Sequence, residues 1–100
     1  MKNFDFIAVG DIVTDAFIEL EDAEVHCNIN HKQCMLSMRF GDKIPYKDAV
    51  VAPAVGNSPN AAVAAARLGL RTALVTDIGG DEHGKENIAR LKKENVDTSF

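Results

Sequence analysis

The fold is decided by residues 55–81, which read VGNSPNAAVAAARLGLRTALVTDIGGD. After a polar start, Ser58 and Pro59 are typical of the N-cap and the first position of a helix. The helix is expected to run to about Leu68, with Gly69 just beyond its C-terminus. Five alanines keep this helix slim, so it can lie close against a sheet.

The same stretch continues into a strand and a second helix. The apolar run 72–78 predicts a buried strand of the kind found in parallel sheets. A glycine turn follows, and a helix is expected from residue 82 or 83 to 94, with Asp81 as its cap and Ile88 and Leu91 facing inward. A parallel sheet needs helices on both faces. Because only two helices are expected, the 72–78 strand should keep at least one exposed apolar face.

Upstream of residue 55 the sequence predicts strands. Extended runs are expected at residues 4–9, 12–20, 23–29, 34–40 and 48–54. The run 34–40 alternates polar and apolar side chains, which is typical of an antiparallel sheet with one face in water. The predicted order is one strand, an antiparallel insert, and then alternating strands and helices.

The charge of the chain excludes several classes of partner. Eleven Lys and Arg against fifteen Asp and Glu give a net charge of −4, and the basic residues form no stripe. We therefore expect neither nucleic acid nor an anionic membrane as a partner. With no 18-residue apolar run and no signal-peptide pattern at the N-terminus, a cytoplasmic location is expected. In that reducing compartment Cys27 and Cys34 are predicted to be free thiols.

The polar start of the first helix is the strongest candidate for a binding site. Gly56 permits close backbone approach, and Asn57, Ser58 and Asn60 place donors and acceptors around it. Asn60 is expected in the first helical turn, near free N–H groups. Such a cluster suits the hydroxyl groups of a sugar or a ribose. Ordinary turn and capping chemistry is an equally supported alternative, because it uses the same residue types.

Asp15 is a second candidate, because it is an acid within the otherwise apolar run VTDAFI. Its carboxylate can accept two hydroxyl hydrogen bonds from one ligand. Taken alone, the residue is better explained as a solvent-facing position on an alternating strand.

The turn at residues 79–84 has the glycines of a phosphate loop. It lacks the GxGxxG spacing and the lysine of GK[ST], and its acidic pair Asp81 and Glu82 opposes an anion. A tight strand-to-helix turn is the favoured interpretation.

Two histidines and two cysteines, His26, Cys27, His31 and Cys34, have the chemistry to hold zinc. Their spacing is not a standard pairing, and neighbouring side chains on a strand point to opposite faces. A hairpin with incidental His and Cys is favoured, and no metal site is predicted. No nucleophile–base pair is recognisable, so no catalytic residue is predicted in this chain.

Three segments in the right order resemble the N-terminal part of PfkB (ribokinase-like) carbohydrate kinases. They are FIAVGDIVTDAF, GNSPNAAVAAARLG and TALVTDIGGDEHGKENIARLKKENVDT. The family's spacing of a key Asn, a small residue and two glycines is matched by Asn60, Ala62, Gly69 and Gly79. The resemblance implies part of a doubly wound, Rossmann-like α/β sheet with a small β-sheet lid inserted at about residues 16–54.

The resemblance also implies phosphoryl transfer from ATP, with Mg²⁺, to a hydroxymethyl group of a sugar or nucleoside. Asp15 resembles the acid that binds substrate hydroxyls, and Gly56, Asn57 and Asn60 resemble the substrate turn. In one departure, Val55 replaces the first glycine of the family's Gly-Gly pair, which is expected to stiffen the turn.

The chain covers about the first third of a typical family member. The family's catalytic base, in a GAGD motif near the C-terminus, its anion hole and its nucleotide site have no counterpart here. We therefore expect residues 1–100 to be one partial kinase domain, a fragment that is inactive alone.

Two other interpretations remain open. One is a non-catalytic ligand-binding or dimerisation module whose β insert pairs with a second copy, as the apolar residues Met38 and Phe40 suggest. The other is a dinucleotide-binding fold, which is disfavoured because Gly10 is not followed by the required glycines.

Overall fold

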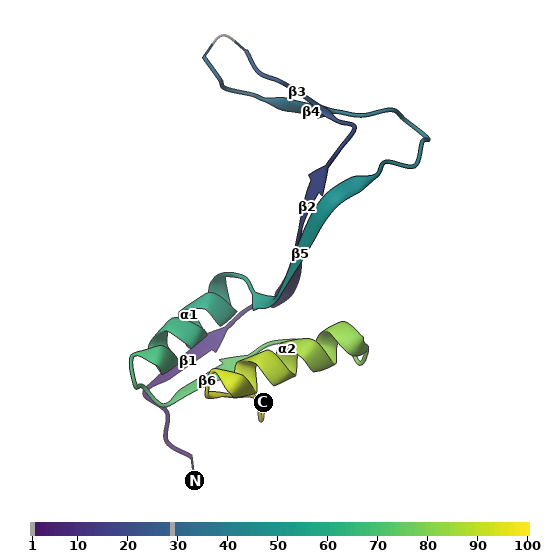
Figure 1. Ribbon diagram of the computed structural model, residues 1–100. Helices are drawn as coiled ribbons and strands as arrows, with labels where there is room; N and C mark the ends of the chain where they lie inside the picture. Colours follow the sequence, from purple (N-terminus) through teal and green to yellow (C-terminus); the bar gives the residue numbers. More distant parts are fainter. Residues whose placement is uncertain (1, 29) are drawn as a thin grey trace. The chain divides into compact units, whose positions relative to one another are not determined.

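The computed structural model describes residues 2–28 and 30–100 (Figure 1). The elements in chain order are β1 (Phe6–Val9), β2 (Val13–Leu20), β3 (Glu24–His26), β4 (Met35–Ser37), β5 (Tyr46–Val55), α1 (Asn57–Arg67), β6 (Thr72–Val75), α2 (Glu82–Lys93) and β7 (Val96–Asp97). The chain divides into two compact units. The smaller one is Ala16–Val50, and the larger one contains the residues before Ala16 together with Val51–Phe100.

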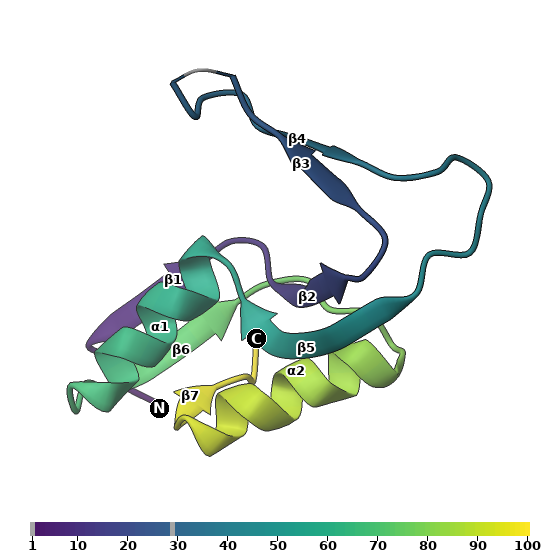
Figure 2. The same ribbon diagram turned by 45° about the horizontal axis from the view of Figure 1, so that its top comes forward.

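The larger unit is built on a parallel sheet with the strand order β1–β6–β7. Phe6 pairs with Thr72, and Thr72 pairs with Val96, so β6 is the middle strand. α1 lies in the connection from β1 to β6, and α2 lies in the connection from β6 to β7, as parallel strands require. Figure 2 shows α1 lying over β1 and β6 and α2 beside β7. The expected mixed α/β class is confirmed, whereas the doubly wound arrangement stays a prediction.

The prediction of an exposed apolar face on residues 72–78 is wrong. β6 has a strand on each side, and its first three side chains, Thr72, Ala73 and Leu74, are at most 3% exposed. The exposed apolar side chains of this sheet lie instead on β1, at one edge, where Ile7 is 49% and Val9 is 74% exposed. β6 is the middle strand, with β1 and β7 at its two edges, and α1 packs over it, so its side chains are covered.

Small residues bring the first helix close to the sheet. Pro59, Ala62 and Ala65 form the buried face of α1, in line with the expected slim helix. The core cluster combines residues from β1, β5, both helices, β6 and β7: Ala8, Ala54, Ala62, Leu74, Leu91 and Val96. Small side chains at the contact permit short distances between helix and strands.

The predicted N-cap of α1 at Ser58 is wrong, because the helix begins earlier. Asn57 is its first residue, and Gly56 is the N-cap with φ 126°, a conformation that favours glycine. Pro59 is therefore the third helical residue rather than the first, where its missing N–H is still tolerated. At the other end the prediction is confirmed, since Gly69 follows the cap residue with φ 90°.

The start of α2 is confirmed as a tight strand-to-helix turn. Asp81 is the N-cap, and its carboxylate accepts a hydrogen bond from the Gly84 amide at 2.9 Å. A Cβ atom at Gly84 would overlap the carbonyl oxygen of Gly79, so the turn requires glycine there. Leu91 is fully buried and Ile88 is half-buried, as expected for the inward face.

The smaller unit contains a short antiparallel hairpin of β3 and β4. Both strands are shorter than the predicted runs 23–29 and 34–40, and Ile29, at the end of the first run, lies outside the described residues. None of the described side chains of Ala16–Val50 is buried. The described residues of this unit therefore form no apolar core of their own.

The prediction of free thiols is wrong, because Cys27 and Cys34 form a disulfide. The register of the hairpin explains the bond. His26 pairs with Met35, so the next residues outward on the two strands face each other, with their Cα atoms 4.0 Å apart.

No helix among the described residues is long and apolar enough to span a membrane.

Candidate functional site

The polar turn at the start of α1 lies against the chain that leaves β1. The Ser58 hydroxyl donates a hydrogen bond to the carbonyl oxygen of Asp11 at 3.0 Å. A Cβ atom at Gly56 would come within 3.2 Å of the same oxygen. The close approach that Gly56 permits is therefore made, in this structure, by the protein's own backbone.

The N-terminus of α1 has no side-chain cap among the described residues, and its first turn holds no acidic residue. The backbone N–H of Asn60 donates to the carbonyl oxygen of Gly56 at 3.0 Å, which closes the first helical turn. The side chains of Asn57 and Asn60 are exposed. The positive end of the helix dipole can thus interact with polar oxygen atoms from outside the helix.

Asp15 lies on β2 with an exposed side chain. Within residues 2–28 and 30–100 no hydrogen bond joins its carboxylate to the α1 turn, so the structure groups Gly56, Asn57 and Asn60 without adding Asp15 by direct contact. The two segments are linked one step away, because Thr14 and Ala54 both donate to one side chain.

That side chain is Asn87, which the sequence analysis missed. It lies on α2, is 6% exposed, and its Oδ1 atom accepts from the Ala54 amide at 2.7 Å and from the Thr14 hydroxyl at 3.3 Å. The buried positions of α2 are Gly84, Asn87 and Leu91, which follow one another at helical spacing. A polar residue within this buried stripe is the sequence feature that could have revealed Asn87.

A cavity of about 500 Å³ opens beside α1, between the end of β5 and both helices. Its polar lining is Asn60, Arg67, Arg90 and Glu94, and its remaining walls are apolar. It includes only one of the predicted site residues, Asn60.

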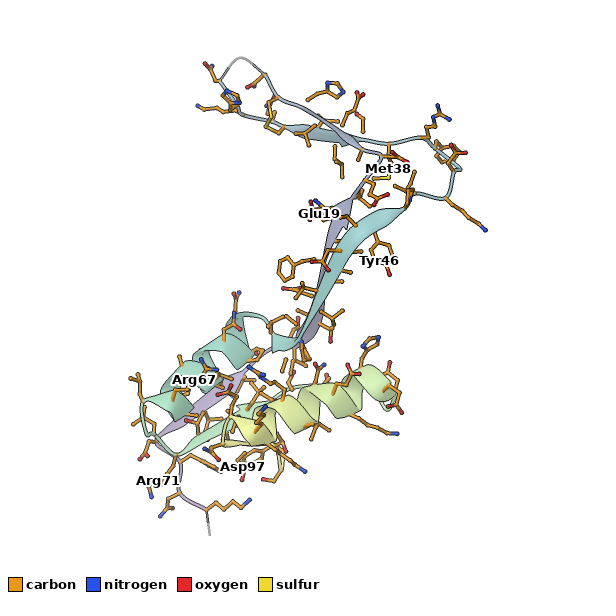
Figure 3. The ribbon with its side chains drawn as sticks, in the orientation of Figure 1. Glu19, Met38, Tyr46, Arg67, Arg71 and Asp97 are labelled. Carbon is orange, nitrogen blue, oxygen red and sulfur yellow. A yellow bond between two sulfur atoms is a disulfide. The ribbon has the colours of Figure 1, made fainter. Side chains whose placement is uncertain are left out.

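The charges in this cavity are already paired. The Arg67 guanidinium (Figure 3) donates to the two Glu94 oxygens at 2.6 and 2.8 Å, and Arg90 approaches the same carboxylate at 3.3 Å. The Arg67 hydrogen bond lowers the pKa of Glu94, with a further contribution from the charge of Arg90. This cluster therefore joins the two helices and does not supply an unpaired acid or base.

A second, larger cavity, of about 750 Å³, belongs to the smaller unit. It is lined by residues such as Glu24, Met38, Arg39 and Asp42 and includes none of the predicted site residues. It is wide and mixed in charge, and it does not mark the predicted site.

No group of three or more His, Cys, Asp or Glu side chains is arranged for a metal ion within the described part of the chain. Of the four residues weighed for zinc, Cys27 and Cys34 are joined in the disulfide and offer no thiolate ligand. The two cysteines instead link the two strands of the hairpin.

The chain matches a known protein family. The model of the pfkB family of carbohydrate kinases matches residues 22–100. That range includes Gly56, Asn57 and Asn60 but not Asp15. No curated protein matches the chain.

Proposed function

Because this chain belongs to the pfkB family of carbohydrate kinases, we propose that it forms the substrate-binding and lid region of a kinase that phosphorylates a hydroxymethyl group of a sugar or nucleoside. The family match over residues 22–100 carries the proposal, since it spans the polar turn at the start of α1. The same match favours the enzyme over a non-catalytic module built on this fold.

Asn57 and Asn60 are proposed to bind substrate hydroxyls together with the open N-terminus of α1. Their exposed side chains offer both donors and acceptors, and the helix start carries no acid of its own to compete for its N–H groups. Gly56 gives this turn its shape. Asp15 is proposed to accept hydrogen bonds from two hydroxyls, and its exposed carboxylate supports that role.

ATP and Mg²⁺ are the cofactors that the family implies, and the described residues do not fit them. No acidic cluster for a metal is present in that part of the chain. In the glycine turn before α2, the Asp81 carboxylate is committed to the Gly84 amide, and Asp81 with Glu82 opposes phosphate. We therefore assign this chain only the binding and orientation of the acceptor, and no catalytic residue.

The unit Ala16–Val50 is proposed to act as a lid that excludes water from the bound substrate. Its exposed apolar side chains, with Met38 at 48% and Phe40 at 104% exposure, also support pairing with a second copy. We propose a cytoplasmic location for the kinase.

The test is a phosphorylation assay of the full-length protein with ATP, Mg²⁺ and a broad panel of sugars and nucleosides. We expect ATP consumption with at least one of them, and a product phosphorylated on its hydroxymethyl group. Glu82→Gln is a suitable control, because Glu82 is an exposed acid that pairs with Lys85 and lies outside the proposed site. This variant should leave the rate unchanged. ATP consumption with none of the panel would overturn the proposal.

A further inference from the structure

Asn87 holds together the two places where the chain leaves and re-enters the larger unit. Its single Oδ1 atom accepts from Ala54, near the end of β5, at 2.7 Å and from Thr14, near the start of β2, at 3.3 Å. The side chain is 6% exposed, so water does not replace these bonds easily. Asn87 therefore acts as a shared acceptor for two distant segments.

The bond to Ala54 supports an unusual backbone conformation. Ala54 has φ 58°, in the left-handed region that residues other than glycine seldom adopt. Ala54 is also 5% exposed, so its N–H group would be buried without a partner if Asn87 were absent. The corner at Ala54 is thus held by one side chain from α2.

This corner precedes the proposed substrate turn directly. Gly56, the N-cap of α1, lies two residues after Ala54, and the residue after Thr14 is Asp15. One residue separates Ala54 from Gly56, and Thr14 is directly bonded to Asp15. A shift of Ala54 is therefore passed to the substrate turn, and a shift of Thr14 is passed to Asp15.

We propose that Asn87 is a positioning residue that fixes the substrate turn and Asp15 relative to each other. This inference rests on the proposed kinase function. Asn87 touches no substrate in this proposal and acts only through Thr14 and Ala54.

The first test measures the corner itself in the full-length protein. Asn87→Leu removes the acceptor at similar size, and Asn87→Asp keeps an acceptor oxygen. We expect amide hydrogen exchange at Ala54 to become at least about fivefold faster in Asn87→Leu and to stay near the wild-type rate in Asn87→Asp. Unchanged exchange in Asn87→Leu would overturn the inference.

The second test separates positioning from stability. Asn87→Leu should raise KM for the sugar about tenfold while kcat stays within about twofold, because binding groups are displaced but the transfer machinery is not. Adding Ala54→Gly should recover part of that KM, since glycine adopts the corner conformation without help. A loss confined to kcat, or no recovery by Ala54→Gly, would indicate a merely structural Asn87 and overturn the inference.

If Asn87→Leu fails to fold, a milder variant tests the positioning role. Thr14→Val removes one of the two donors at nearly constant shape, and we expect about a threefold rise in KM. No change in KM would count against Asn87 as the link to Asp15. If the wild-type protein phosphorylates no substrate, the proposed function and the positioning role both fail, whereas an active Asn87→Leu enzyme with wild-type KM overturns only the positioning role.

Discussion

The two helices of the larger unit begin in opposite ways. At α2, the Asp81 side chain caps the helix and Glu82 adds a negative charge to the first turn. At α1, Gly56 is the N-cap, no side chain of residues 2–28 or 30–100 caps the helix, and the first turn has no acid. One helix start is satisfied by its own residues, and the other is open to a partner.

The same contrast extends to the backbone around the two starts. The α2 turn is packed so closely on itself that Gly84 leaves no room for a side chain. The α1 turn depends on distant segments, through Ser58 on Asp11 and Ala54 on Asn87. A self-contained turn contributes stability, whereas a turn built from several segments is suited to hold groups in place for a ligand. The predictions below test this division.

The largest expected effect is at the α2 turn. Gly84→Ala should lower the free energy of unfolding by about 3 kcal/mol, because the new Cβ collides with the Gly79 carbonyl oxygen. Urea denaturation measures the change. Gly80→Ala is the matched control, since a Cβ there meets nothing within 4 Å, and it should change stability by less than about 0.5 kcal/mol. Equal effects of the two variants would contradict the packing described here.

The next largest effect concerns the open site. Asp15→Ala should raise KM for the substrate by about 30-fold, because a charged acceptor of two hydroxyl hydrogen bonds is lost. Stability should stay within about 0.5 kcal/mol, since Asp15 is exposed. Steady-state kinetics of the full-length protein measure KM, and an unchanged value would remove Asp15 from the site.

A paired substitution separates the two helix starts directly. Asp81→Ala should cost about 1 kcal/mol of stability through the lost cap and leave KM unchanged. Asn57→Ala should do the reverse, with a raised KM and nearly unchanged stability. Asp81→Asn, which keeps a capping oxygen, serves as the control and should retain most of the stability. A loss of stability in Asn57→Ala would contradict the proposed difference between a stabilising α2 start and a ligand-binding α1 start.

The smallest expected effect on stability is at the amino ends of β1 and β6, and it involves neither helix start. The Arg71 guanidinium (Figure 3) donates to the Asp5 carboxylate at 2.7 and 3.0 Å and lowers the pKa of Asp5 to about 2. A lowered folded-state pKa means that the pair stabilises the fold above pH about 3.9, the unfolded pKa, and that this contribution is lost as the pH falls toward 2.

Acid denaturation checks this expectation. Asp5→Asn should lower stability slightly at neutral pH, where the pair is formed, and should flatten the part of the stability curve between pH 4 and 2, where the wild-type protein loses the same contribution. The effect should be small because Asp5 is at the surface. NMR titration of the Asp5 carboxyl should show the same low pKa. A titration near pH 4 would contradict the ion pair.

Local sequence signals predicted the parts of the fold that depend on neighbouring residues. Asp81 lies three residues before the amide that it caps, and Gly69 directly follows the end of α1, so both were found from residue type and spacing. The parallel strand was also predicted from the apolar run 72–78, although β6 ends at Val75, earlier than expected.

The errors arose where distant residues decide the outcome. Ser58 is a good N-cap by type, but its hydroxyl donates to the carbonyl oxygen of Asp11, 47 positions away, and the N-cap is Gly56 instead. The disulfide follows from the β3–β4 register, which two cysteines alone do not reveal.

The candidate site shows the same limit. The family pattern located Gly56, Asn57 and Asn60, which lie within one helical turn. Asn87 was missed because both of its donors come from segments more than 30 positions away, at sequence separations of 33 and 73. A buried polar residue on a helix is visible in the sequence, but its partners are not.

The shared acceptor has one more consequence for the insert between β1 and α1. Thr14 and Ala54 donate to the same oxygen, so the insert begins and ends at nearly one point of the larger unit. A segment whose two ends meet can be lengthened, shortened or exchanged for another hairpin with little cost to the sheet beneath it. We therefore expect different hairpins to be tolerated between these two residues, and if the insert is the proposed lid, such grafts would change the substrate preference on a constant scaffold.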